Sequence, residues 1–127
     1  MTRVIDAPEA LELLERAMQA KGEDYVDPNA VMGEGCEYGD EFGHPSCIVG
    51  HVFSYLGVDV TTVSRGSVRA VVEQVGIIGH SGELIPDTPG FTYNALTVLD
   101  RAQSIQDGGG TWGDAVASAS MRAKACA

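Results

Sequence analysis

Apolar residues recur at the helical period of about 3.6 residues in several stretches of the chain. The pattern predicts helices over residues 8–21, 45–56, 68–75, 92–107 and 111–120. The third stretch contains four valines, whose branched side chains make a strand the alternative there. We therefore expect a mainly α fold of about five helices in a single compact domain over residues 1–127, with a frayed tail at 121–127.

Residues that favour helix ends agree with these ranges. Asp6 and Glu9 have the spacing of a capping box at the start of the first helix, and Gly22 is suited to end it. A threonine also precedes the fourth helix, where Thr92 is the expected cap. The ends of these two helices are therefore predicted from single residues as well as from periodicity.

The last two predicted helices are separated by glycines 108–110 and by the capping residue Thr111. Such a short connection predicts an antiparallel helical hairpin. Trp112 begins the apolar stripe of the last helix, so we expect it to pack in the core against Phe91 or Tyr93 rather than to bind a partner.

Residues 23–43 contain four glycines and three aspartates, together with Pro28 and Asn29, and these residue types favour turns. Two short segments, 24–26 and 36–38, have a composition that suits strands. They predict a small β-hairpin near residues 24–38, with an irregular loop as the alternative.

The 127-residue chain has 44% apolar and 20% charged residues, as an ordinary globular domain does. It has no apolar run near the roughly 20 residues of a membrane span, and its first 18 residues lack the features of a signal peptide. The three cysteines do not form a disulfide-framework pattern, although a bridge between Cys36 and Cys47 is an alternative to reduced thiols. We therefore expect a cytoplasmic protein that does not bind membranes.

The formal net charge is −10, which argues against nucleic-acid binding because phosphates require a cationic surface. Residues 1–60 hold twelve acidic and three basic residues, whereas residues 61–127 hold six and five. The negative charge is therefore concentrated in the first half of the chain. A solvated acidic surface that aids solubility is the simplest reading, and attraction of a basic protein is the functional one.

Two cysteines and two histidines lie within residues 36–51, which suggests a zinc site formed by Cys36, His44, Cys47 and His51. Their outer spacing does not match a standard zinc finger, and a domain of this length does not require a metal to fold. The alternative is that Cys47 is a small buried apolar residue and that His51 is a hydrogen-bonded or surface histidine.

The same residues suggest a cysteine nucleophile, because Cys47 falls in the first turn of a helix predicted to begin at Pro45 and His51 follows four residues later. This order superficially resembles cell-wall cysteine peptidases. The sheet that follows the cysteine in those enzymes is not predicted here, and His80 lies among glycines rather than in a strand. A non-enzymatic role is therefore favoured.

Four further acidic residues, Glu34, Glu37, Asp40 and Glu41, lie in the segment between the first two predicted helices. Their spacing is not that of a calcium loop. We expect them to contact a basic protein partner.

Several motifs together resemble a family of small uncharacterised helical proteins encoded by actinobacteria and their phages. They are GHPSCIVGH at residues 43–51, LGV at 56–58 and AQSIQDGGGTWGDAV at 102–116. The resemblance spans most of the chain from Cys36 to Val116 and assigns no catalytic residue or cofactor. It implies a phage-encoded accessory protein directed at a host partner.

The sequence thus leads us to expect a protein that acts by protein–protein interaction or by self-association. The alternative is a zinc-binding or thiol-dependent enzyme that uses Cys47 with His44 or His51.

Overall fold

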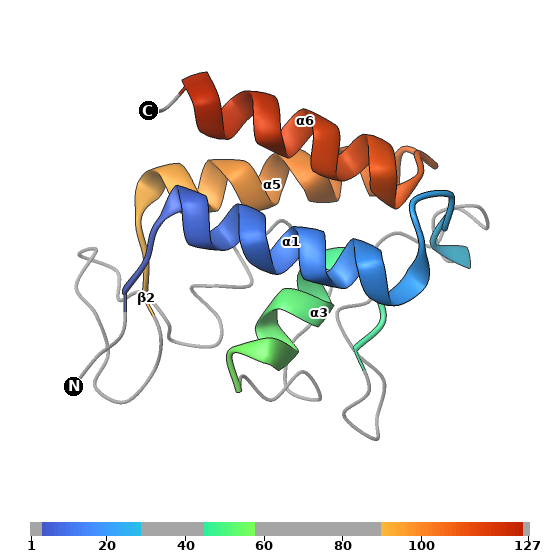
Figure 1. Cartoon of the computed structure of the whole chain (residues 1–127), viewed down its shortest axis with the longest axis horizontal. Coiled ribbons are helices and arrows are strands. Elements are labelled where there is room, and N and C mark those ends of the chain that lie inside the picture. Colours follow the sequence, from blue (N-terminus) through green and yellow to red (C-terminus); the bar gives the residue numbers. More distant parts are fainter. Residues whose placement is uncertain (1–3, 29–44, 58–89, 126–127) are drawn as a thin grey trace.

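The computed structural model describes residues 4–28, 45–57 and 90–125. These residues form helices α1 (Ala7–Lys21), α3 (Ile48–Tyr55), α5 (Tyr93–Asp107) and α6 (Trp112–Ala125), and strands β1 (Val4–Ile5) and β2 (Gly90–Phe91). The predicted mainly helical fold is therefore confirmed, with four helices in the described part (Figure 1). The helix or strand expected over residues 68–75 lies outside that part, as does His80.

Helix α1 begins and ends where its capping residues predict. The carboxylate Oδ1 of Asp6 accepts a hydrogen bond from the Glu9 N–H at 3.0 Å, which satisfies a backbone donor that has no partner within the helix. Gly22 ends the helix with a φ of 104°, a left-handed conformation that glycine adopts without a steric penalty.

Helices α5 and α6 form the predicted antiparallel hairpin (Figure 1). Thr92 Oγ1 caps α5 by accepting from the Ala95 N–H, and Thr111 Oγ1 accepts from the Asp114 N–H at the start of α6. Helix α6 extends to Ala125, so it includes residues 121–125 of the segment expected to fray. Residues 126 and 127 lie outside the described part.

Helix α3 begins at Ile48 rather than at Pro45, so the predicted start was wrong by three residues. The backbone of Cys47 is extended, with φ −83° and ψ 171°, and this residue is the N-cap of the helix. Proline can occupy a first helical turn, but here the capping residue sets the boundary. The helix ends before Gly57, whose φ of 80° agrees with the predicted glycine stop.

The two strands form a parallel pair that the periodicity did not predict. Val4 pairs with Gly90 and Ile5 with Phe91, and the Thr92 N–H donates to the Ile5 carbonyl at 3.0 Å. Residues 24–26 form no strand, so this part of the predicted hairpin was wrong. Residues 29–38 lie outside the described part.

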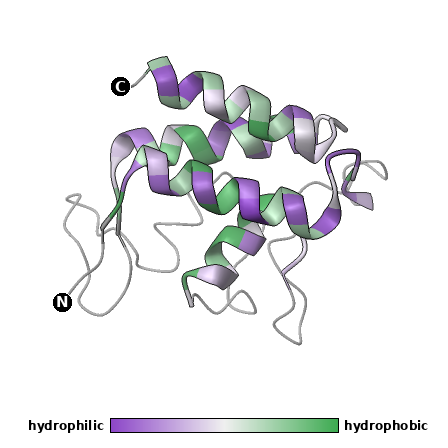
Figure 2. Cartoon of the chain, viewed as in Figure 1, coloured by the Kyte–Doolittle hydropathy of each residue, from purple (hydrophilic) through white to green (hydrophobic). Residues whose placement is uncertain are grey.

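The core lies between the four helices. Helices α1 and α5 pack together, α6 lies along one side of this pair, and α3 crosses the other side (Figure 1). Hydrophobic and hydrophilic residues alternate in bands along α1, as expected of a helix with one buried face (Figure 2). Among residues 4–28, 45–57 and 90–125, no helix has the length and apolar character required to cross a membrane.

Candidate functional site

Cys47 is fully buried, and its thiol serves the fold of α3. The Sγ atom accepts a hydrogen bond from the Gly50 N–H at 3.3 Å, in the position that serine or threonine oxygens usually occupy at a helix start. The thiol is free, so no disulfide joins Cys47 to Cys36. The sulfur is therefore covered and already bonded to the backbone, so a substrate cannot reach it in this structure.

His51 bonds to the backbone of Cys47 rather than to its thiol. Its Nδ1–H donates to the Cys47 carbonyl oxygen at 2.9 Å, and the side chain is only 7% exposed. Burial lowers the pKa of the imidazole, and the positive charge of Lys21 acts in the same direction; the hydrogen bond to Cys47 and the charge of Asp27 act against it. The predicted imidazole–thiol pair is therefore replaced by two separate bonds to the backbone of α3.

Trp112 is at the centre of an aromatic cluster that joins three separate segments of the chain. Its ring contacts Tyr25 at a centroid distance of 4.7 Å and His51 at 5.2 Å, both edge to face. The expected core position is confirmed, but the expected partners were wrong, because Phe91 contacts Phe53 and Tyr93 is 64% exposed. The Trp112 Nε1–H is buried and has no acceptor among the described residues.

Two buried glutamines of α5 were missed as important residues. Gln106 Oε1 accepts from the Ile48 N–H at 2.8 Å, and both Gln106 Nε2 and Gln103 Nε2 donate to Asp107 Oδ1 at 3.0 Å. Burial raises the pKa of the Asp107 carboxyl, although these two donors act against the shift. Glutamines on the apolar stripe of α5 were the available signal, since a buried amide requires hydrogen-bond partners.

The residues of the other predicted sites fall mainly in the undescribed part of the chain. Cys36 and His44 of the zinc site lie there, as do the four acidic residues expected to meet a partner, Glu34, Glu37, Asp40 and Glu41. Within residues 4–28, 45–57 and 90–125, no group of three or more histidine, cysteine, aspartate or glutamate side chains is arranged to hold a metal ion.

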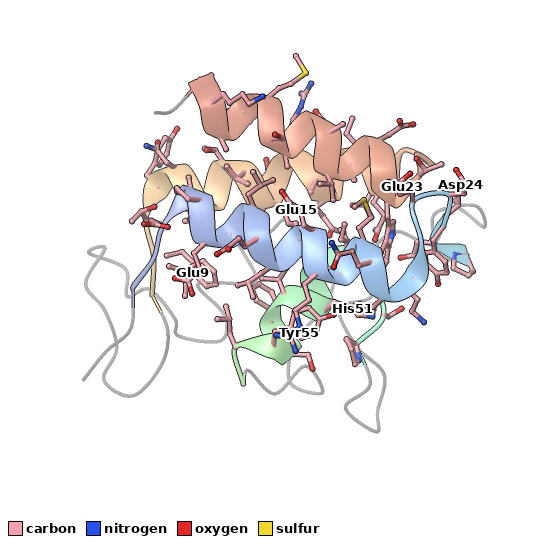
Figure 3. The ribbon with its side chains drawn as sticks, in the orientation of Figure 1. Glu9, Glu15, Glu23, Asp24, His51 and Tyr55 are labelled. Carbon is pink, nitrogen blue, oxygen red and sulfur yellow. The ribbon has the colours of Figure 1, made fainter. Side chains whose placement is uncertain are left out.

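The acidic surface of the described part lies on α1 and on the turn that follows it. Figure 3 shows Glu9 and Glu15 along α1, with Glu23 and Asp24 beyond its end. The two basic residues of segment 4–28 contact aromatic rings: Arg16 lies 4.1 Å from the Tyr55 ring centroid and Lys21 lies 5.5 Å from that of Tyr25.

No ion pair joins Glu15, Glu23 or Asp24 to a base in the described ranges. These three carboxylates therefore have no counter-ion among the residues that the structure describes. A comparison of the chain with protein-family models, with curated proteins and with solved structures gives no match.

Proposed function

We propose that this protein is non-enzymatic and acts by binding another protein. The contact surface of that partner is rich in lysine and arginine and meets acidic residues of this chain. The observation that carries the proposal is the uneven charge of the described segments. Residues 4–28 hold seven acidic and two basic residues, whereas residues 90–125 hold three of each. Both bases of the first segment lie against tyrosine rings, and Glu15, Glu23 and Asp24 form no ion pair with a base among the described residues, so these three carboxylates can attract a partner.

The geometry of α3 supports a binding role over a thiol-dependent one. Cys47 Sγ and His51 Nδ1 each bond to the backbone of their own helix, so His51, the histidine within the described residues, is not placed to activate the thiol. Acidic surfaces, in contrast, accelerate and orient association with basic partners without any catalytic group.

The resemblance to proteins of actinobacteria and their phages supports a narrower proposal. On that basis the protein is a phage-encoded accessory protein in the host cytoplasm, and its partner is a host protein. Self-association is the competing proposal for the same surface.

Charge reversal tests the proposal. Changing Glu37, Asp40 and Glu41 to lysine is expected to abolish binding of a partner purified from the host, while the circular dichroism spectrum stays unchanged. Reversing Glu73, Glu83 and Asp87 gives the same change in net charge in the other half of the sequence, so it serves as the control. Equal binding by both variants would contradict a role for Glu37, Asp40 and Glu41 in binding. A stoichiometric zinc ion in the purified protein, lost together with folding in Cys47→Ser, would instead favour the metal-binding alternative.

A further inference from the structure

A groove of about 460 Å³ lies between α1 and α6. Its lining includes the apolar side chains of Met18, Val116 and Ala117. Grooves of this size between two helices are suited to receive the side chains of a third helix. The volume is therefore large enough for side chains of a protein segment.

Four carboxylates also line this groove. Glu15 comes from α1, Glu23 and Asp24 come from the turn after it, and Asp114 comes from the first turn of α6. Figure 3 shows Glu23 and Asp24 beside the start of α6. None of the described residues that line the groove is basic, so no lysine or arginine among them balances its charge.

A second groove on the same molecule has the same volume and a different charge. It lies between α5 and α6, and its lining includes Arg101 and Arg122 with a single acidic residue, Asp100. The two grooves thus provide an internal comparison. A basic ligand that recognises only shape would enter both, whereas one that recognises charge would enter the α1–α6 groove alone.

We propose that the α1–α6 groove is the docking site for an amphipathic basic helix of the partner protein. Lysine and arginine carry apolar stems beneath charged heads, which matches a groove lined by both apolar side chains and carboxylates. The apolar residues of that helix would contact Met18, Val116 and Ala117, and its cationic groups would reach the carboxylates. This inference rests on the proposed function, since it assigns the partner's chemistry and the place where it binds.

The test uses a synthetic helical peptide of leucine, alanine and lysine, and a matched peptide in which glutamate replaces every lysine. NMR of the ¹⁵N-labelled full chain is expected to show that the lysine peptide shifts the amides of Glu23, Gly113 and Ala117. The glutamate peptide is expected to shift none of them. Fluorescence anisotropy then measures affinity. Combining Glu23→Lys with Asp114→Lys is expected to raise the Kd of the lysine peptide by about tenfold, because two attractions become repulsions.

Two controls separate the groove from general electrostatics. The pair Glu12→Lys and Asp100→Lys makes the same change in charge at exposed positions outside the groove, and it is expected to change the Kd less than about threefold. Ala117→Trp fills the groove without altering charge and is expected to block binding, whereas Ala20→Trp, at an exposed position on α1 outside the groove, is not.

Each result decides between the groove and the broader proposal. If both charge pairs raise the Kd of the lysine peptide equally, or if the peptide shifts only amides outside the groove, the groove is not the docking site. Binding through an acidic surface would still stand. If the lysine peptide does not bind but a purified host partner does, the groove is likewise overturned and binding through an acidic surface stands. If neither the peptide nor a host partner binds, the proposed function fails as well. Urea unfolding of each variant identifies any that has lost its fold.

Discussion

His51 is a buried titratable side chain at the contact between α3 and α6. Its imidazole lies against Trp112, donates to the Cys47 carbonyl and is 7% exposed. The neutral ring is favoured in this environment because burial lowers its pKa in the folded protein. The unfolded chain retains the ordinary histidine pKa of about 6.5 and so binds a proton more readily.

Stability is therefore expected to depend on pH through His51. Its contribution is complete above the unfolded pKa of about 6.5 and is lost as the pH falls through the lower pKa of the folded state. The free energy of unfolding in urea, measured between pH 7.5 and 5.5, should decrease toward acid. In His51→Gln this dependence should become shallower, and an identical slope in the two proteins would contradict the assignment. Asp107 acts in the opposite direction at lower pH, because its pKa is raised in the folded state.

Gln106 provides a second test at the level of one side chain. Gln106→Leu keeps a side chain of similar size but removes the acceptor of the Ile48 N–H. A buried donor left without a partner costs roughly 1–3 kcal/mol. We therefore expect urea denaturation to show a loss of that size, whereas Gln19→Leu on the exposed surface of α1 should change stability by less than about 0.5 kcal/mol. Similar losses in the two variants would show that the buried hydrogen bond is unimportant.

At the level of elements, the turn after α1 meets the first turn of α6 through close backbone contacts. The Gly113 N–H donates to the Glu23 carbonyl at 2.8 Å, and the Trp112 N–H donates to the Tyr25 carbonyl at 2.9 Å. A Cβ atom at Gly113 would lie 2.9 Å from the Glu23 carbonyl oxygen, nearer than side-chain carbons approach. Glycine is thus required there by the packing of the turn after α1.

Gly113→Ala is accordingly expected to destabilise the protein even though it lies in a helix. Alanine gains roughly 1 kcal/mol over glycine in a helix interior, but overpacking against backbone costs roughly 1–3 kcal/mol. The second effect should dominate and lower the melting temperature. At Gly108 a Cβ would lie 3.5 Å or more from its neighbours, so Gly108→Ala is the matched control. A higher melting temperature for Gly113→Ala would refute the close contact.

Local signals predicted the helices that have local causes. The caps at Asp6, Thr92 and Thr111 were predicted because each bonds to a backbone N–H three residues later. The start of α3 was not predicted, because cysteine is an uncommon cap and the acceptor for the Ile48 N–H comes from Gln106, far along the chain. The contacts around Trp112 could not be predicted for the same reason. Periodicity placed Trp112 in the core, but its contacts with Tyr25 and His51 depend on tertiary packing.

For the whole molecule, residues from all four described helices share one hydrophobic core. Trp112 in α6 contacts His51 in α3, and α1 packs against α5. A shared core favours cooperative unfolding. We therefore expect Trp112 fluorescence and far-ultraviolet circular dichroism to report the same urea midpoint, and two separate midpoints would indicate independent folding units.

The parallel pairing of Val4–Ile5 with Gly90–Phe91 has a kinetic consequence. It closes a loop that spans most of the chain, and closing this loop costs conformational entropy. The contact stabilises the fold only after other interactions have offset that cost. The helical hairpin, by contrast, requires only local contacts. We therefore expect the strand pair to form after the folding transition state.

Ile5→Ala tests this order, because it removes a fully buried side chain from the pair. In stopped-flow experiments it should accelerate unfolding and leave the refolding rate nearly unchanged, as expected of a contact absent from the transition state. Slower refolding would place the pair in the nucleus. If it forms late, the start of the chain is the last described segment to join the fold and the first to leave it.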